Sequence, residues 1–242
     1  RELPNAAILA IDIDGLVDAA LVLINYGVKT ILLEKPGAID LAQLIQLNKV
    51  AIEHSANVFI AYNRRFYSSV QKALDIIHDD GGVRAFNFEF TEWSHIIKGL
   101  NHNQTIKESW FLANSTHVVD LAFFIGGKPL EVNCLHSGFL SWHSRSSNFS
   151  GSGKTDSGAL FSYLSDWDAP GRWAVEIITV NHRLYFSPLE KLKVMKKGSI
   201  NITDINLDDQ FDVQYKPGLY KQVESLLSGD YAQLCKIDEQ IN

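Results

Sequence analysis

The residues best suited to chemistry close an apolar run near the start of the chain: Glu34 and Lys35, followed at once by Pro36. Residues 30–33 show no alternation of polar and apolar side chains, which predicts a strand buried on both faces. Pro36 cannot continue a strand ladder, and it restricts Lys35 to an extended or turn conformation. The acid and the base are therefore expected at the carboxyl end of a strand, where open α/β sheets bind ligands. A lysine placed there can take or return a proton.

A second set of reactive side chains lies on a helical pattern between residues 110 and 125. Asn114 is a candidate cap, His117 follows near the start of the helix, and Asp120 comes one turn later. An imidazole can share a proton near neutral pH, and Asp120 can orient the ring or simply stabilise a turn. An isolated helix histidine is more often structural, so the spacing alone leaves both interpretations of His117 open.

A third set, Asn63, Arg64 and Arg65, follows the next apolar run, at residues 57–62. Arginine holds carboxylate or phosphate groups in a two-pronged geometry, which would suit the diphosphate of a sugar nucleotide. A helix start with solvated arginines explains the same residues equally well.

The elements that must position these residues follow two patterns. Up to residue 61, strands alternate with helices that close at Gly27 and reopen at Asp40, which predicts βαβ units of a parallel sheet. Beyond it, the chain reads mostly as strands with a few helices, which predicts an open, mostly antiparallel sheet with helices on one face. We therefore expect an α/β domain at residues 1–61 and an α+β domain at residues 62–242.

Three separated segments, taken together, resemble the Gfo/Idh/MocA family of glucose-fructose oxidoreductases and inositol dehydrogenases. They are the Glu-Lys-Pro at residues 34–36, the segment at residues 61–66 and the His-x-x-Asp helix at residues 114–121, in the order that the family has them. The resemblance implies that residues 1–61 are the C-terminal part of a Rossmann domain and that the second domain binds substrate and forms a homodimer or homotetramer through its sheet. It also implies hydride transfer between a sugar or sugar-nucleotide hydroxyl carbon and the nicotinamide of NAD or NADP.

The same resemblance implies a role for each candidate residue. The catalytic pair would be Lys35 and His117. The cofactor would contact Glu34, Lys35, Pro36, Asn63 and Arg64, and the substrate would contact Arg65, Asn114 and Asp120.

Two features depart from the family pattern. The glycine-rich phosphate-binding motif and the ribose-binding residue are absent, so we expect the chain to lack the first part of the native protein. Many members carry an aspartate where this chain has Ala113. Either Lys35 and His117 suffice, or Glu92 or Glu108 substitutes, or the protein binds without turnover. The alternatives are a non-catalytic NAD(P)- and sugar-binding regulator and, less favoured, a redox-assisted glycosidase.

Composition excludes other classes of protein. The chain has 242 residues, 46% of them hydrophobic, and a net charge of -6, which argues against nucleic acid and anionic membranes as partners. Its two cysteines, far apart, favour a cytoplasmic protein without a disulfide framework. The histidines lack metal-binding spacing, so no metal site is predicted. Residues 151–155 read Gly-Ser-Gly-Lys-Thr, but strand signals follow them, so we expect a loop rather than a phosphate-binding motif.

Overall fold

The computed structural model describes residues 2–242, and their contacts divide the chain into two units. The first unit comprises the chain up to Phe66 together with Gly218–Asn242, and the second is Tyr67–Pro217. The sequence placed all of residues 62–242 in the second domain, and the structure differs by returning the C-terminal segment to the first. The reason is a strand pairing: Cys235 and Lys236 lie antiparallel to the third strand of the first sheet.

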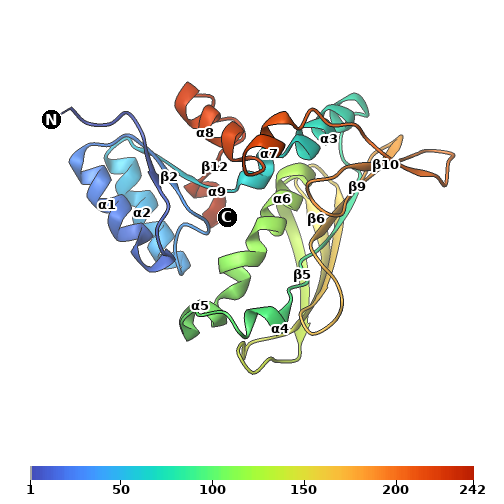
Figure 1. Ribbon diagram of the computed structural model, residues 1–242, viewed down its shortest axis with the longest axis horizontal. Helices are drawn as coiled ribbons and strands as arrows, with labels where there is room; N and C mark the ends of the chain where they lie inside the picture. The colour runs from blue at the N-terminus through green and yellow to red at the C-terminus, as the bar shows by residue number, and fades with distance from the viewer. Residues whose placement is uncertain (1) are drawn as a thin grey trace. The chain divides into compact units, whose positions relative to one another are not determined.

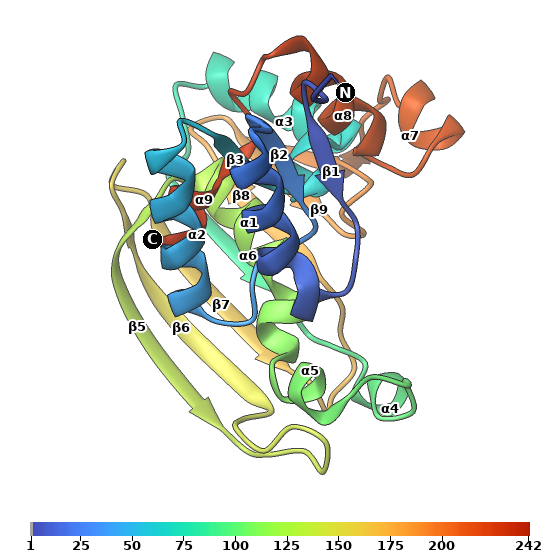
Figure 2. The ribbon, with the colours of Figure 1, turned by 90° about the vertical axis from the view of Figure 1, so that its left-hand side faces the viewer.

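The first unit is a four-stranded sheet with helices on both faces. Strands β1, β2 and β3 are parallel, and the order is β1-β2-β3-β12 (Figure 2). Its elements are β1 (Ala7–Leu9), α1 (Leu16–Tyr26), β2 (Thr30–Leu33), α2 (Leu41–Glu53), β3 (Asn57–Ile60), α8 (Leu219–Ser228), β12 (Cys235–Lys236) and α9 (Ile237–Ile241).

The two faces of this sheet explain why its strands lack alternation. Ile31 and Leu33 of β2 belong to the apolar cluster formed with α1 and α2. Leu32, between them, points to the other face, where Leu226 of α8 covers it. Every residue of β2 is therefore buried, as the uninterrupted apolar run predicted.

The second unit is built on an eight-stranded sheet in the order β11-β10-β9-β8-β4-β7-β6-β5, in which only the β4–β7 pair is parallel among the described strands. Its strands are β4 (Ala85–Glu89), β5 (Pro129–Ser137), β6 (Asn148–Thr155), β7 (Leu160–Asp166), β8 (Ala174–Ile178), β9 (His182–Phe186), β10 (Lys193–Lys196) and β11 (Ile202–Asp204). Its helices are α3 (Ser68–Asp79), α4 (Ser94–Ile97), α5 (Gln104–Glu108), α6 (Thr116–Gly126) and α7 (Gln210–Gln214).

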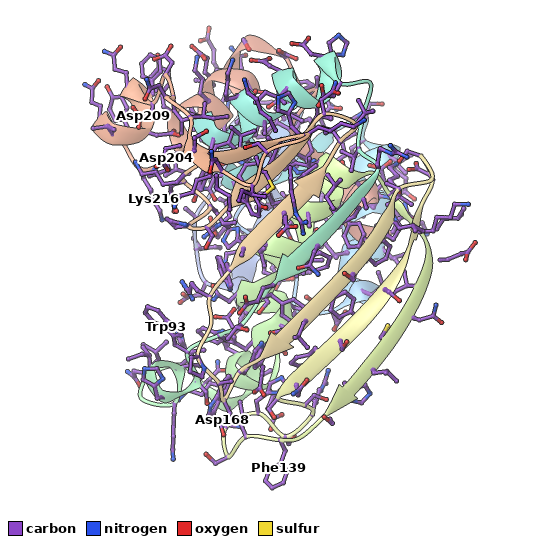
Figure 3. The ribbon with its side chains drawn as sticks, turned by 90° about the vertical axis from the view of Figure 1, so that its right-hand side faces the viewer. Trp93, Phe139, Asp168, Asp204, Asp209 and Lys216 are labelled. Atoms are coloured by element: carbon purple, nitrogen blue, oxygen red, sulfur yellow. The ribbon has the colours of Figure 1, made fainter. Side chains whose placement is uncertain are left out.

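Helices cover one face of this sheet. Helix α6 runs along the strands (Figure 1), and its Leu121 is buried in one cluster with Phe86 and Phe88 of β4. Figure 3 shows the opposite face, which carries no helix. On that face Asn87 donates to the Ser162 hydroxyl over 2.9 Å. The open, mostly antiparallel sheet with helices on one face, expected from the sequence, is confirmed.

The glycine-rich segment at residues 151–155 is part of strand β6, not the loop that the sequence predicted. A Cβ atom on Gly153 would lie 1.9 Å from the Glu131 carbonyl oxygen of the neighbouring strand, and one on Gly151 would lie 2.5 Å from that of Asn133. The glycines therefore allow β5 and β6 to approach closely. The segment has no following helix, so the rejection of a phosphate-binding motif is consistent with its structure.

A membrane-spanning helix would need a longer and more apolar run than any helix within residues 2–242 provides.

Candidate functional site

Lys35 lies at the carboxyl end of the central parallel strand of the first unit. Strand β2 ends at Leu33, and the Glu34 amide still donates to the Leu9 carbonyl of β1 over 2.9 Å. The chain then turns, and the Gly37 amide donates to the Glu34 carbonyl over 3.1 Å. Both Glu34 and Lys35 are half-buried. The acid and the base are thus fixed at the sheet edge where ligands bind in this class of sheet.

Gly37 makes this turn possible. Its φ of +89° is in the left-handed region, and a Cβ atom there would lie 2.5 Å from Ile60 Cδ1 on the neighbouring strand β3. The preceding Lys35–Pro36 peptide bond is cis. A turn that passes this close to β3 accepts glycine and resists larger residues.

Asn63 and Arg64 follow β3 at the same edge of the sheet, in a short 3-10 turn, Asn63–Phe66. Asn63 is buried, and its side-chain oxygen lies 3.5 Å from an Arg64 guanidinium nitrogen. Arg65 is only 3% exposed, and its guanidinium donates to Glu239 over 2.7 Å within the same unit. In this structure Arg65 contacts helix α9 through Glu239, and its role in substrate binding stays a prediction.

His117 lies in the first turn of α6 in the second unit. It is 7% exposed, and its ring centroid is 6.0 Å from that of Trp173, which precedes strand β8. The helix is preceded by a π-helical turn, Phe111–Ser115, a rare feature that is frequent at functional sites. The sequence predicted the helix, and the structure adds the π turn directly before the histidine.

Glu92 is the carboxylate that holds this π turn. It is 2% exposed. It accepts hydrogen bonds from Ser115 Oγ over 2.7 Å, from Asn114 Nδ2 over 3.1 Å and from Trp173 Nε1 over 3.3 Å. Burial raises the pKa of the Glu92 carboxyl, and the bonds from Ser115 and Asn114 with the charge of Arg172 moderate that increase.

Of the two carboxylates that the sequence offered in place of the missing aspartate, the structure brings Glu92 to the segment of Ala113. Glu108 instead accepts a hydrogen bond from Gln104 within the exposed helix α5. Asn114, expected to bind substrate, donates to Glu92 in this structure. Asp120 is half-buried one turn beyond His117.

Sequence reasoning missed Trp173 and its neighbour Arg172. Arg172 stacks on two indoles, with its guanidinium carbon 4.9 Å from the ring centroid of Trp173 and 4.8 Å from that of Trp93. Neither residue belongs to a motif, and both lie more than fifty positions from His117. The sequence carried no signal that could have found them, because only strand pairing of β4 with β8 brings the segments together.

A separate cavity of about 340 Å³ lies between α6 and the strands of the second unit, and aromatic side chains such as Phe111, Phe123 and Tyr163 line it. Neither His117 nor Glu92 lines it, so this cavity is distinct from the surroundings of His117.

The comparisons with known proteins identify the fold of this chain. No family model and no curated protein matches the sequence. Solved structures do match. An inositol dehydrogenase homolog from Azotobacter vinelandii, complexed with NADH and myo-inositol, is 14% identical over 98% of this chain and 72% of its own, with a TM-score of 0.75.

Two further solved structures have the same fold. UDP-N-acetylglucosamine 3-dehydrogenase from Acidithiobacillus ferrooxidans is 14% identical over 98% of this chain and 74% of its own, with a TM-score of 0.74. A dehydrogenase from Clostridium difficile is 16% identical over 98% of this chain and 75% of its own, with a TM-score of 0.76. The likeness that the three sequence motifs predicted is therefore confirmed for the fold.

Proposed function

We propose that the protein is an NAD(P)-dependent oxidoreductase that transfers hydride between a hydroxyl carbon of a sugar or sugar nucleotide and nicotinamide. The observation that carries the proposal is the place of Lys35, half-buried at the carboxyl end of the central parallel strand in a fold shared with sugar dehydrogenases. One of those structures is described as a complex with NADH and myo-inositol.

The residues at this edge suit a dinucleotide. The tight turn at Gly37 holds Glu34 and Lys35 at the sheet edge, and Glu34, Lys35, Pro36, Asn63 and Arg64 would hold the cofactor there. When bound, the nicotinamide ring supplies the hydride acceptor or donor.

The chain's own residues would manage the hydroxyl proton. As the alcohol becomes a carbonyl, its carbon loses hydride to the nicotinamide and its O–H bond breaks. Lys35, acting as the neutral amine, would take that proton at Nζ, and in the reverse direction its ammonium form would return it. His117 shares the proton through its imidazole, and Glu92 keeps the helix start that carries His117 in place. Asp120 and Asn114 remain proposed substrate-side residues, although Asn114 already donates to Glu92.

The test is absorbance at the reduced-nicotinamide band, with either cofactor and a panel of sugars and sugar nucleotides. We expect turnover that Lys35→Ala and His117→Ala each abolish, while both variants keep the wild-type thermal unfolding midpoint and His117→Ala still binds the cofactor. Turnover that survives both substitutions would overturn the assigned roles.

A regulator of the same fold is the second candidate, and Ala113 favours it, because many members of the family have an aspartate at that position. Binding of cofactor and sugar without hydride transfer between them would support the regulator over the enzyme.

We also propose that two copies pair through the open sheet face of the second unit, where Leu160 and Leu164 are each 60% exposed. Analytical ultracentrifugation of the wild type and of Leu164→Glu tests this pairing. We expect a dimer for the wild type and a monomer for the variant. A reducing compartment such as the cytoplasm suits the two cysteines, which form no disulfide within residues 2–242.

A further inference from the structure

Arg172 is held in one orientation at the surface of the second unit. Its guanidinium lies between the rings of Trp93 and Trp173, with centroids 4.8 Å and 4.9 Å away. The side chain is still 51% exposed. Figure 3 shows Trp93 at the surface, in the segment that follows β4. Stacking of a guanidinium on indole faces is favourable by about 0.5–2 kcal/mol per ring, so the two rings restrict a side chain that is otherwise mobile.

The backbone beneath Arg172 is fixed as well. The Trp93 indole N–H donates to the Gly171 carbonyl over 3.0 Å, and the Arg172 amide donates to Glu89 Oε1 over 3.1 Å. A Cβ atom on Gly171 would lie 2.2 Å from the same Glu89 oxygen, so the Glu89 side chain would have to move to admit one. The arginine is thus ordered before any ligand arrives, which lowers the entropy cost of binding.

The charge of Arg172 is only partly compensated. The carboxylate nearest to it is that of Glu92, 3.9 Å away, a distance too long for a hydrogen bond. Glu92 is already occupied by donors from Ser115 and Asn114. Within residues 2–242, the guanidinium donates no hydrogen bond to a protein acceptor. The planar guanidinium group, a two-pronged fork of N–H donors, is therefore partly open to solvent. Its geometry matches the two oxygens of a carboxylate or a phosphate.

The same indole links this fork to the proposed chemistry. Trp173 packs against Arg172 on one side and lies 6.0 Å, between ring centroids, from His117. Resting on the proposed function, we infer that Arg172 binds an anionic group of the substrate, a carboxylate or a phosphate, while His117 serves a hydroxyl of the same molecule. The substrate class is thereby narrowed to sugar acids and sugar phosphates, including sugar nucleotides.

The test compares the wild type with Arg172→Gln and Arg172→Lys, using glucuronate as the sugar acid, glucose 6-phosphate as the sugar phosphate, and glucose as the neutral probe. Binding is measured by calorimetry and by the fluorescence of the flanking tryptophans. Hydride transfer is measured by nicotinamide absorbance. We expect Arg172→Gln to weaken binding of one or both anionic sugars by about 10- to 100-fold, since a charge-assisted bidentate contact is lost, and to leave glucose binding unchanged.

Arg172→Lys keeps the charge without the fork, so we expect it to recover only part of the loss. The matched control is Arg183→Gln, because Arg183 is 48% exposed, pairs with Glu176 and lies on the open face of the sheet. It should leave binding of all three probes unchanged. The preferred anion, carboxylate or phosphate, identifies the substrate's acidic group.

Equal binding of glucuronate and glucose 6-phosphate by wild type and Arg172→Gln would overturn the inference, whether or not sugars are oxidised. The failure of the proposed function gives a different result. In that case no sugar is oxidised, yet the anionic probes still bind and their binding still depends on Arg172. That result would support the anion-binding role of Arg172 and contradict the proposed oxidoreductase activity.

Discussion

Ser115, two positions before His117 in the sequence, donates a 2.7 Å hydrogen bond to the buried carboxylate of Glu92. This contact joins the segment after β4 to the start of α6. A histidine at a helix start can shift when the preceding turn loosens, and Glu92 prevents that at the last residue of the π turn. We therefore predict that Glu92, from a segment distant in sequence, takes a positioning role in place of the carboxylate absent at Ala113.

Replacement of Glu92 by alanine should lower both stability and turnover. The donors of Ser115, Asn114 and Trp173 would lose their acceptor, which should reduce the free energy of unfolding by about 2–4 kcal/mol. The displaced histidine should lower kcat by about 10- to 100-fold. Glu92→Gln keeps one acceptor oxygen and should recover part of both. Urea denaturation and initial rates measure the effects.

Glu108→Ala is the matched control for that prediction, because the Glu108 carboxylate accepts its hydrogen bond from Gln104 within its own helix, α5. Its free energy of unfolding should change by less than about 0.5 kcal/mol. Similar losses in the Glu92 and Glu108 variants would contradict a specific positioning role for Glu92.

The raised pKa of Glu92 should appear in the pH dependence of stability. Between the ordinary value of 4.5 and the raised value, the folded protein holds a proton that the unfolded chain has released. Stability from this group is therefore fully present below about pH 4.5 and falls as the pH rises through the folded-state pKa. Glu92→Gln should flatten that part of the profile. Unfolding free energies from pH 4 to 8, in both proteins, test the sign.

The contribution of Asp80 to stability should depend on pH in the opposite direction to that of Glu92. Burial opposes its ionisation, but hydrogen bonds from Thr179, Asn181 and His182 outweigh burial and lower the pKa of Asp80 from 3.8 to about 2. The resulting stability, about 2 kcal/mol, is present above about pH 4 and is lost as the pH falls towards 2. Asp80→Asn should remove this acid-sensitive part, and denaturant midpoints at pH 6, 4 and 2 measure it.

The neighbouring Asp79→Asn substitution controls for a general loss of negative charge, since Asp79 is exposed at the end of α3. An Asp79 variant that changed acid stability as much as the Asp80 variant would show that the contacts of Asp80 are not the cause.

Gly37→Ala should distort the Glu-Lys-Pro turn. Alanine at a φ of +89° should lower the free energy of unfolding by about 1 kcal/mol. The added Cβ atom would also lie 2.5 Å from Ile60 Cδ1, and this overpacking should lower it by about 1–3 kcal/mol more. Gly81→Ala has a similar φ of +80° with no atom within 4 Å of the added Cβ, so it carries the backbone cost alone. Thermal unfolding of the two variants separates the terms, and equal losses would exclude the clash with Ile60.

Cofactor affinity extends the same comparison. Gly37→Ala should weaken NAD(P) binding, because the turn that it distorts carries Lys35, whereas Gly81→Ala should not. Unchanged cofactor affinity in a folded Gly37→Ala protein would argue against the proposed cofactor role of this turn.

The local sequence determined the elements that carry Lys35 and His117. The apolar run before Glu34 specifies a buried strand, and Pro36 ends it, because these effects act between adjacent residues. The helix of His117 follows from side-chain periodicity in the same way. These signals were sufficient for the fold class.

Only the tertiary structure decided which distant groups meet those elements. Periodicity tells which side of a strand or helix is buried, not which segment covers it, so the return of β12 to the first sheet carried no sequence signal. The same holds for Glu92 beneath the turn of His117, and for Arg172, whose stacking depends on two indoles eighty positions apart. Such contacts arise from strand pairing and packing across the whole unit, which no local pattern of residues encodes.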